Sequence, residues 1–169
     1  MVTGVQTCAL PISIYLNCAT PPLGRPGRAF ELGRAVGEHL AALDRKVLYV
    51  GSGGLSHSPP SLVATASGMS DEERIAMNEA GREAAKLKID PDWDNALLRR
   101  IAEEPETLAA LTADEIAKAG VGAHEVRTWM AAVAAGGTPM ETVVYEPVPE
   151  WITGMGISAT SLAALGLAC

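Results

Sequence analysis

The alternation of apolar and polar positions predicts a helix between two short strands in the first third of the chain. Over residues 26–43, apolar side chains recur every three or four positions while the charged ones fall elsewhere, as in an amphipathic helix. Apolar runs at residues 12–17 and 47–50 flank this helix, and such short runs, ended by turn-forming residues, are typical of buried strands. Short connections between strand, helix and strand predict a βαβ unit with parallel strands.

Downstream of residue 60 the pattern predicts mainly helices. Two capping boxes, in which serine or threonine is followed three residues later by glutamate, mark helix starts at Ser70 and Thr112. Another helix begins at Asp90-Pro91, because proline is favoured in the first turn, and a last helix covers residues 123–135. The remaining segments are predicted as a loop or weak helix at 61–69, a strand at 142–145, an extended loop at 147–151 and a small, apolar tail from 158.

The loop that follows the second apolar run gathers the residues best suited to chemistry. Residues 51–54 contain three glycines, and Ser56-His57 and Pro59-Pro60 come directly after them. Glycine lets the backbone approach a ligand closely, and open α/β sheets bind ligands at strand ends, so His57 is the candidate functional group. Three established motifs are absent from this loop: the G-x-S-x-G elbow, the dinucleotide fingerprint G-x-G-x-x-G, and the lysine-containing phosphate loop.

Composition narrows the function classes. The chain has 169 residues, which suits one domain, and a formal net charge of −7, which argues against nucleic acid or an anionic membrane as a partner. No apolar run reaches the roughly 18 residues of a membrane helix, so no membrane association is expected. The three cysteines show neither C-x-x-C nor zinc-site spacing, which predicts a reducing, cytoplasmic location.

The loop GSGGLSHSPP at residues 51–60 resembles the signature loop of the class III extradiol ring-cleavage dioxygenases. The similarity is greatest to members that cleave 2,3-dihydroxyphenylpropionate. Further stretches typical of the family occur in the family's order: NCATPPL at 17–23, WDN at 93–95, HEVRTW at 124–129 and PVPEWITGMG at 147–156.

The resemblance implies a fold and a domain assignment. The expected fold class is α/β, a three-layer α/β/α arrangement with a mixed, largely parallel sheet. Residues 13–169 would be the C-terminal portion of the catalytic dioxygenase domain, and the N-terminal half would be missing. Residues 1–12 fit neither a helical or strand period nor the family at this point, and we expect them to be a non-native leader.

The resemblance also implies the chemistry: Fe(II)-dependent extradiol cleavage, by O2, of a 3-substituted catechol such as 3-(2,3-dihydroxyphenyl)propanoate. His57 would be the catalytic acid/base, and Glu125, four residues before a tryptophan, would be an iron ligand. Ser56, beside His57, is a candidate substrate-binding residue. The family's two iron-binding histidines and its second acid/base histidine belong to the missing half, and neither His39 nor His124 stands in those motifs. We therefore expect this chain to be inactive alone, and the full-length protein to be a homo-oligomer.

Three alternatives remain open. In the first, the substrate is another catechol or a protocatechuate-like acid. In the second, the chain is a non-enzymatic or partner-completing subunit, since some members of the family split their chains. In the third, the chain is an unrelated α/β hydrolase, although the nucleophile elbow is absent. The sequence does not single out a partner for the substrate's carboxylate tail, for which Arg25, Arg28 and Arg127 are available.

Overall fold

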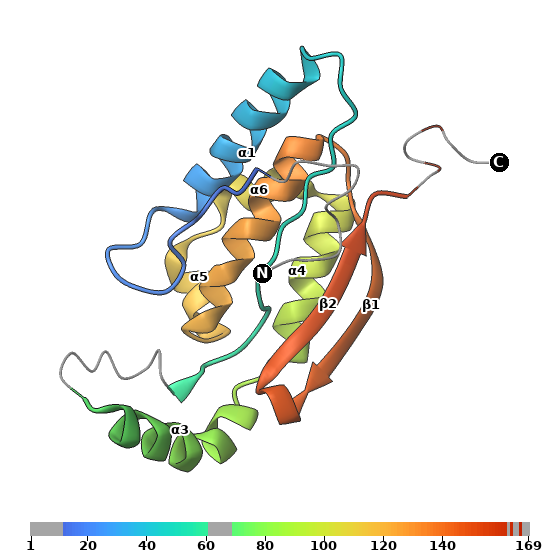
Figure 1. Cartoon of the computed structure of the whole chain (residues 1–169). Coiled ribbons are helices and arrows are strands. Elements are labelled where there is room, and N and C mark those ends of the chain that lie inside the picture. Colours follow the sequence, from blue (N-terminus) through green and yellow to red (C-terminus); the bar gives the residue numbers. More distant parts are fainter. Residues whose placement is uncertain (1–11, 61–68, 162, 164–165, 167–169) are drawn as a thin grey trace.

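The computed structural model describes residues 12–60, 69–161, 163 and 166. Nearly all of the expected leader at 1–12 and of the segment 61–69 therefore lies outside the described residues. Figure 1 shows helices gathered on one side of a long β-hairpin, with an extended segment passing between helix α6 and the hairpin. The chain thus combines helix and strand, in agreement with the α/β class predicted from the sequence.

Helices begin close to the positions that the sequence signals mark. Ser70 and Thr112 form complete capping boxes with Glu73 and Glu115, and the Asp90 side chain accepts a hydrogen bond from the Trp93 N–H. The helices are α1 (Pro26–Ala41), α3 (Asp71–Lys86), α4 (Pro91–Glu103), α5 (Ala113–Lys118) and α6 (Val126–Gly136). Short 3-10 turns lie between the later helices, η1 (Pro105–Ala110) and η2 (Gly122–Glu125), and a third, η3 (Pro149–Trp151), lies in the C-terminal part of the chain. The last helix is thus preceded by η2, which contains both His124 and Glu125.

The sheet is a two-stranded antiparallel hairpin. Strand β1 (Glu141–Val148) pairs with β2 (Thr153–Ala159), and Tyr145 lies opposite Gly156. The strand predicted at 142–145 is confirmed and is longer than expected. The segment 147–151, predicted as a loop, ends β1 and forms η3, and β2 was missed because its many small residues carry little alternation of apolar and polar side chains.

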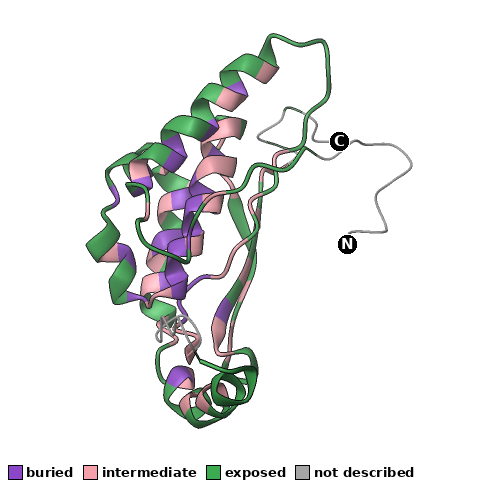
Figure 2. Ribbon diagram, turned by 60° about the vertical axis from the view of Figure 1, so that its left-hand side comes forward, coloured by how far each residue is buried: buried purple, intermediate pink, exposed green. Residues whose placement is uncertain are grey.

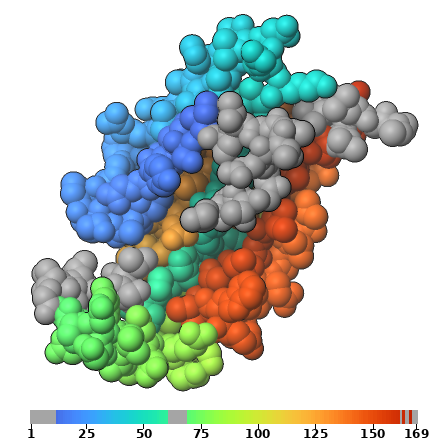
Figure 3. Space-filling model, viewed as in Figure 1, coloured from blue at the N-terminus to red at the C-terminus, as the bar shows by residue number. Residues whose placement is uncertain are grey.

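The two strands predicted at residues 12–17 and 47–50 are not formed, and this prediction is wrong for the described residues. Most of their apolar side chains are exposed: Tyr15 is 92% exposed and Leu48 is 85% exposed. A strand exists only when a neighbouring strand accepts and donates its backbone hydrogen bonds. Within the part of the chain that the structure describes, neither segment has such a neighbour, and the predicted parallel sheet is not confirmed. In Figure 3 the second segment reaches the surface between the N-terminal part and the hairpin.

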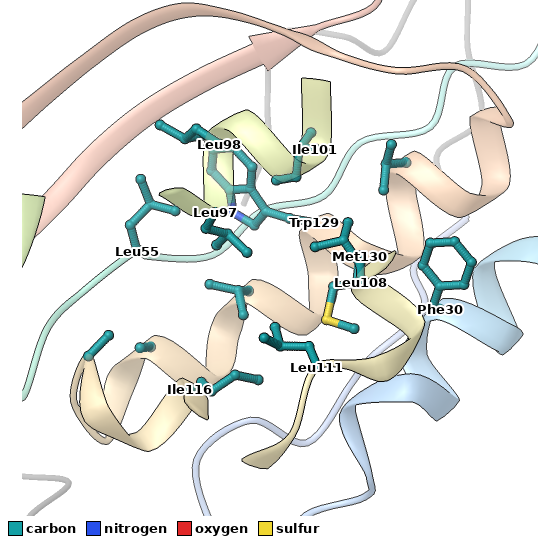
Figure 4. Packing of buried hydrophobic residues seen from close by; sticks show 14 residues of the cluster. Phe30, Leu55, Leu97, Leu98, Ile101, Leu108, Leu111, Ile116, Trp129 and Met130 are labelled. Atoms are coloured by element: carbon teal, nitrogen blue, oxygen red, sulfur yellow. The ribbon is translucent and has the colours of Figure 1, made fainter. Parts of the chain in front are cut away.

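The core is centred on α6, whose buried face is turned toward α1 and α4 (Figures 2 and 4). Trp129 and Met130 of α6 pack with Leu97 and Ile101 of α4, and Leu55 of the glycine-rich loop belongs to the same cluster. The loop that carries the candidate histidine is therefore fixed to the core by its own leucine.

Helix α1 contacts α6 through glycines as well as through its predicted apolar stripe. A Cβ at Gly33 would lie 2.1 Å from the Ala131 carbonyl oxygen, and one at Gly37 would lie 2.2 Å from that of Ala135. The stripe itself is only partly buried, since Leu32 and Leu43 remain exposed while Ala29 is covered. The two helix backbones thus approach more closely than any side chain at these positions would permit.

Candidate active site

The backbone on both sides of His57 is held by hydrogen bonds from two separate parts of the chain. The Gly122 N–H donates to the His57 carbonyl oxygen (3.0 Å), and the Gly154 N–H donates to the Ser56 carbonyl oxygen (3.0 Å). His57 also forms an isolated bridge with Thr153. The predicted catalytic residue is therefore buried and its backbone position is fixed by η2 and by the start of β2.

A hydrogen bond within the loop determines which nitrogen of the His57 ring carries hydrogen. Nδ1 lies 2.8 Å from the Leu55 carbonyl oxygen, and a carbonyl can only accept. Nδ1 must then be the N–H donor, which leaves Nε2 with the lone pair in the neutral ring. The structure thus presents Nε2 as the basic atom of His57.

Glu125 lies directly opposite that basic atom. Its Oε1 is 3.9 Å from His57 Nε2, while its Oε2 accepts a hydrogen bond of 2.6 Å from the Gly54 N–H. The Glu125 side chain is 39% exposed and the His57 side chain only 10%. The two residues that the sequence assigned to one site are therefore neighbours in space, with the carboxylate on the solvent side of the ring.

Two glycines enclose the His57 ring. A Cβ at Gly122 would lie 2.2 Å from Nε2, and a Cβ at Gly54 would lie 2.6 Å from Cε1. Neither glycine has the positive φ that would itself require glycine. Glycine is required at these two positions for steric reasons alone, because the His57 ring occupies the volume that a side chain would fill.

Ser56, the predicted substrate-binding residue, is fully buried and its hydroxyl already has two partners. Its Oγ–H donates to Asp94 Oδ2 (2.7 Å), and its Oγ accepts from the Asp90 N–H (2.8 Å). Tyr145 also donates to Asp94 Oδ2 (2.8 Å), and the Ser56 N–H donates to Asp94 Oδ1 (2.7 Å). A role of Ser56 in substrate binding stays a prediction, whereas its part in this buried network is observed.

Burial affects the pKa of both acids in this network. It raises the pKa of the Asp94 carboxyl, although the hydrogen bonds from Ser56 and Tyr145 act in the opposite direction. The pKa of the Tyr145 phenol is also raised, first by burial and then by its bond to Asp94. The sequence had placed Asp94 in a family-like stretch and Tyr145 in a strand without giving either a role. The roles of Asp94 and Tyr145 become visible only in the structure, where α4, β1 and the glycine-rich loop lie in contact.

The loop at residues 17–25 is tied to η2 and α6 by Arg127. Its guanidinium donates to the carbonyl oxygens of Gly24 (3.2 Å) and His124 (3.1 Å), and the residue is only 3% exposed. Burial lowers the pKa of Arg127 and of His124, and raises that of Cys18. Of the arginines considered for a substrate carboxylate, Arg127 is thus committed to the interior, while Arg25 and Arg28 are exposed.

A complete metal site is not formed by the part of the chain that the structure describes. No group of three or more His, Cys, Asp or Glu residues there is arranged to hold a metal ion. Glu125 Oε1 and His57 Nε2 are donor atoms of suitable type at one place, but Fe(II) sites of this class use two histidines and one carboxylate. The donor set present here does not by itself fit Fe(II).

Comparison with known proteins gives one family. Residues 6–156 match the model described as the catalytic LigB subunit of aromatic ring-opening dioxygenase. A protein of Photorhabdus laumondii named 2,3-dihydroxyphenylpropionate/2,3-dihydroxicinnamic acid 1,2-dioxygenase is 36% identical over 92% of this chain and 58% of its own length. One of the same name from Rhodococcus jostii is 37% identical over 94% of this chain and 59% of its own length.

The chain thus spans somewhat less than three fifths of the length of these curated relatives. Among the helices in the described ranges, none combines the length and apolar character needed to cross a membrane.

Proposed function

The chain belongs to the family of the catalytic LigB subunit of aromatic ring-opening dioxygenases, and on this basis we propose that it supplies His57 and Glu125 to the extradiol cleavage of a catechol. The reaction breaks the ring bond next to the two hydroxyl-bearing carbons and inserts both atoms of O2. The observation that carries the proposal is the free Nε2 of a buried histidine 3.9 Å from a partly exposed carboxylate. The names of the relatives support 2,3-dihydroxyphenylpropionate, or a closely similar 3-substituted catechol, as the substrate.

His57 acts as the base in this proposal. A catechol hydroxyl gives up its proton to Nε2, and the imidazolium that forms has the Glu125 carboxylate beside it. The two charged groups would then lie 3.9 Å apart, with the carboxylate partly open to solvent. The bond from Nδ1 to the Leu55 carbonyl is kept throughout, so the ring does not need to turn when it takes the proton.

We further propose that Glu125 is one of three ligands of Fe(II), and that the other two come from outside the described residues. The metal ligands found here are incomplete, and the relatives are considerably longer than this chain. The 169-residue chain alone is therefore proposed to be inactive.

The uncovered apolar segments agree with this proposal. Residues 12–17 and 47–50 have the composition of buried strands, but they form no strand in the described ranges and most of their side chains are exposed. Additional chain that supplies neighbouring strands would cover them and would complete the three-layer α/β/α arrangement with a largely parallel sheet. A partner subunit would serve equally well, and the same exposed segments favour this second candidate, a subunit that completes the site of another chain.

The test compares the 169-residue chain with a longer protein encoded by the same reading frame, read upstream in the source DNA. Both are supplied with Fe(II), air and 2,3-dihydroxyphenylpropionate, and formation of the yellow ring-opened product is followed by absorbance. We expect product only from the longer protein, and its His57→Gln variant should bind iron without turnover. Glu125→Gln should lower the iron content. Ring cleavage by the 169-residue chain alone would contradict the proposal, and an upstream stop codon would favour the partner-subunit alternative.

A further inference from the structure

One peptide group joins the buried carboxylate of Asp94 to the ring of His57. The N–H of the peptide between Leu55 and Ser56 donates to Asp94 Oδ1 at 2.7 Å, and the carbonyl of the same peptide accepts from His57 Nδ1 at 2.8 Å. We propose that Asp94 acts through this peptide as a positioning residue, which holds His57 in the Nδ1–H tautomer and so keeps Nε2 free as the base. This inference rests on the proposed function for its chemical meaning, and on the two hydrogen bonds for its geometry.

The hydrogen bonds around Asp94 suit an ionised carboxylate and oppose the effect of burial on its pKa. Its partners are the Ser56 N–H, the Ser56 hydroxyl and the Tyr145 hydroxyl, and each of these donates. The Ser56 oxygen accepts from the Asp90 N–H, and its own hydrogen is directed to Asp94 Oδ2. An uncharged acid would have to give its own hydrogen to one of these groups. Donation by all three partners is therefore the pattern that a carboxylate satisfies.

A carboxylate that accepts the N–H of a peptide strengthens the acceptor character of the carbonyl at the peptide's other end. Hydrogen bonds in series polarise one another, and the effect is larger where water is excluded. Asp94 and Ser56 are both fully buried, and Leu55 is 1% exposed. The Leu55 carbonyl thus becomes a better partner for the His57 N–H than an ordinary carbonyl would be, which favours the Nδ1–H form over the Nε2–H form.

Packing leaves Asp94 little freedom to abandon this position. A Cβ at Gly154 would lie 2.1 Å from Asp94 Oδ2, so the strand backbone is directly against the carboxylate. Tyr145 of β1 holds the same oxygen from another direction, and α4 carries Asp94 itself. The carboxylate is consequently fixed by three elements, and the peptide is fixed by the carboxylate.

The test measures the tautomer directly, by ¹⁵N NMR of the His57 ring in the 169-residue chain at a pH where the ring is neutral. No metal or substrate is present, so the outcome does not depend on turnover. The Asp94→Asn variant keeps the shape of the side chain but removes its charge. We expect the ratio of the Nδ1–H to the Nε2–H form to fall by on the order of tenfold, because a charge-assisted hydrogen bond becomes a neutral one.

Two variants separate the peptide-mediated effect from general support of the loop. Ser56→Ala removes the hydroxyl bond to Asp94 but keeps the backbone N–H, and Tyr145→Phe removes the phenol bond but keeps the carboxylate. Both should leave the tautomer ratio within about twofold of the unmodified chain, a shift of no more than about 0.4 kcal/mol. A ratio that is unchanged in Asp94→Asn, or that changes equally in all three variants, would overturn the inference.

A second measurement covers the case in which Asp94→Asn does not fold. In the unmodified chain, the Ser56 N–H should show a through-hydrogen-bond coupling to the carboxyl carbon of Asp94 and a strongly downfield amide proton. Absence of both signs in a folded sample would also overturn the inference. If these signs are present while the longer protein lacks ring-cleaving activity, the proposed function fails and the peptide-mediated connection stands.

Discussion

Replacing Gly122 by alanine tests how the site holds its histidine. The new Cβ would lie 2.2 Å from His57 Nε2, 2.4 Å from Cδ2 and 2.5 Å from Cε1, whereas ordinary contact begins near 3.4 Å. The ring would have to withdraw by roughly 1 Å, a distance that packed interiors do not absorb freely. The ring cannot move freely toward Gly54 either, because the backbone there is so close that an added Cβ would lie 2.6 Å from His57 Cε1.

The magnitude follows from what the displaced ring loses. Moving it breaks or lengthens the 2.8 Å bond from Nδ1 to the Leu55 carbonyl, and such a bond contributes about 1 kcal/mol. A side chain forced away from its rotamer costs about 1 kcal/mol more. We therefore expect Gly122→Ala to lower the free energy of unfolding by about 2 kcal/mol, within the range that overpacking produces.

Urea unfolding gives this free energy, and ¹⁵N NMR of the ring reports the lost Nδ1 bond in the same sample. Gly136→Ala is the matched control, because nothing lies within 4 Å of that position and its φ is not positive. The control should be neutral or stabilising by up to about 1 kcal/mol, since alanine is the better helix former. Equal stability of Gly122→Ala and the unmodified chain, with an unchanged His57 ring signal, would refute the reasoning.

Three further predictions concern the core, a helix cap and the loop near the site. Ile101→Ala, at a fully buried position, should lower the free energy of unfolding by about 2–5 kcal/mol in urea. The bonds from Thr112 hold the pKa of Glu115 below its usual value, so their stabilisation is present above the unfolded pKa near 4.5 and is lost as pH falls through the folded pKa. Glu115→Gln should therefore flatten the fall of Tm below pH 4.5. Arg127→Lys should speed the alkylation of buried Cys18, followed by site-resolved mass spectrometry, because lysine does not reproduce the paired bonds of the guanidinium.

Each of these has an outcome that would contradict it. Leu87, which is 85% exposed, serves as the core control, and an equal loss from Leu87→Ala and Ile101→Ala would mean that burial does not decide the cost. Parallel curves of Tm against pH for the unmodified chain and Glu115→Gln would show that the bonds between Thr112 and Glu115 do not contribute to the loss of stability in acid. Unchanged alkylation of Cys18 in Arg127→Lys would show that the loop at 17–25 is held by other contacts.

Local signals predicted the helices well because the residues that decide a helix start lie within one turn of it. Ser70, Thr112 and Asp90 each cap the helix that the sequence assigned to them. The strands at 12–17 and 47–50 were predicted from what they would bury, and the pattern contains no information on whether a neighbouring strand is present. Strand β2 was missed for the opposite reason. It pairs with β1 along its length, but its small residues give little of the apolar–polar alternation that predicts a strand.

The residues of the candidate site also differ in whether the local sequence could indicate them. His57 and Glu125 were predicted because each stands in a recognisable stretch, and in the structure His57 Nε2 lies 3.9 Å from Glu125 Oε1. Asp94 was not assigned a role, because its importance depends on a peptide group 38 positions away in the chain. Hydrogen bonds that join α4 to a distant loop leave no periodic trace in sequence.

The glycines at residues 51–54 have a consequence for how such a protein can diversify. A Cβ at Gly51 would lie 2.5 Å from the Thr128 carbonyl oxygen, and one at Gly53 would lie 2.7 Å from that of Glu125. The segment therefore rests directly on the backbone of η2 and α6, with no side chain between them to be exchanged. Libraries randomised at these glycines should contain few folded members. Tolerated variation is then confined to positions surrounding this contact, and laboratory evolution of the proposed activity should begin there.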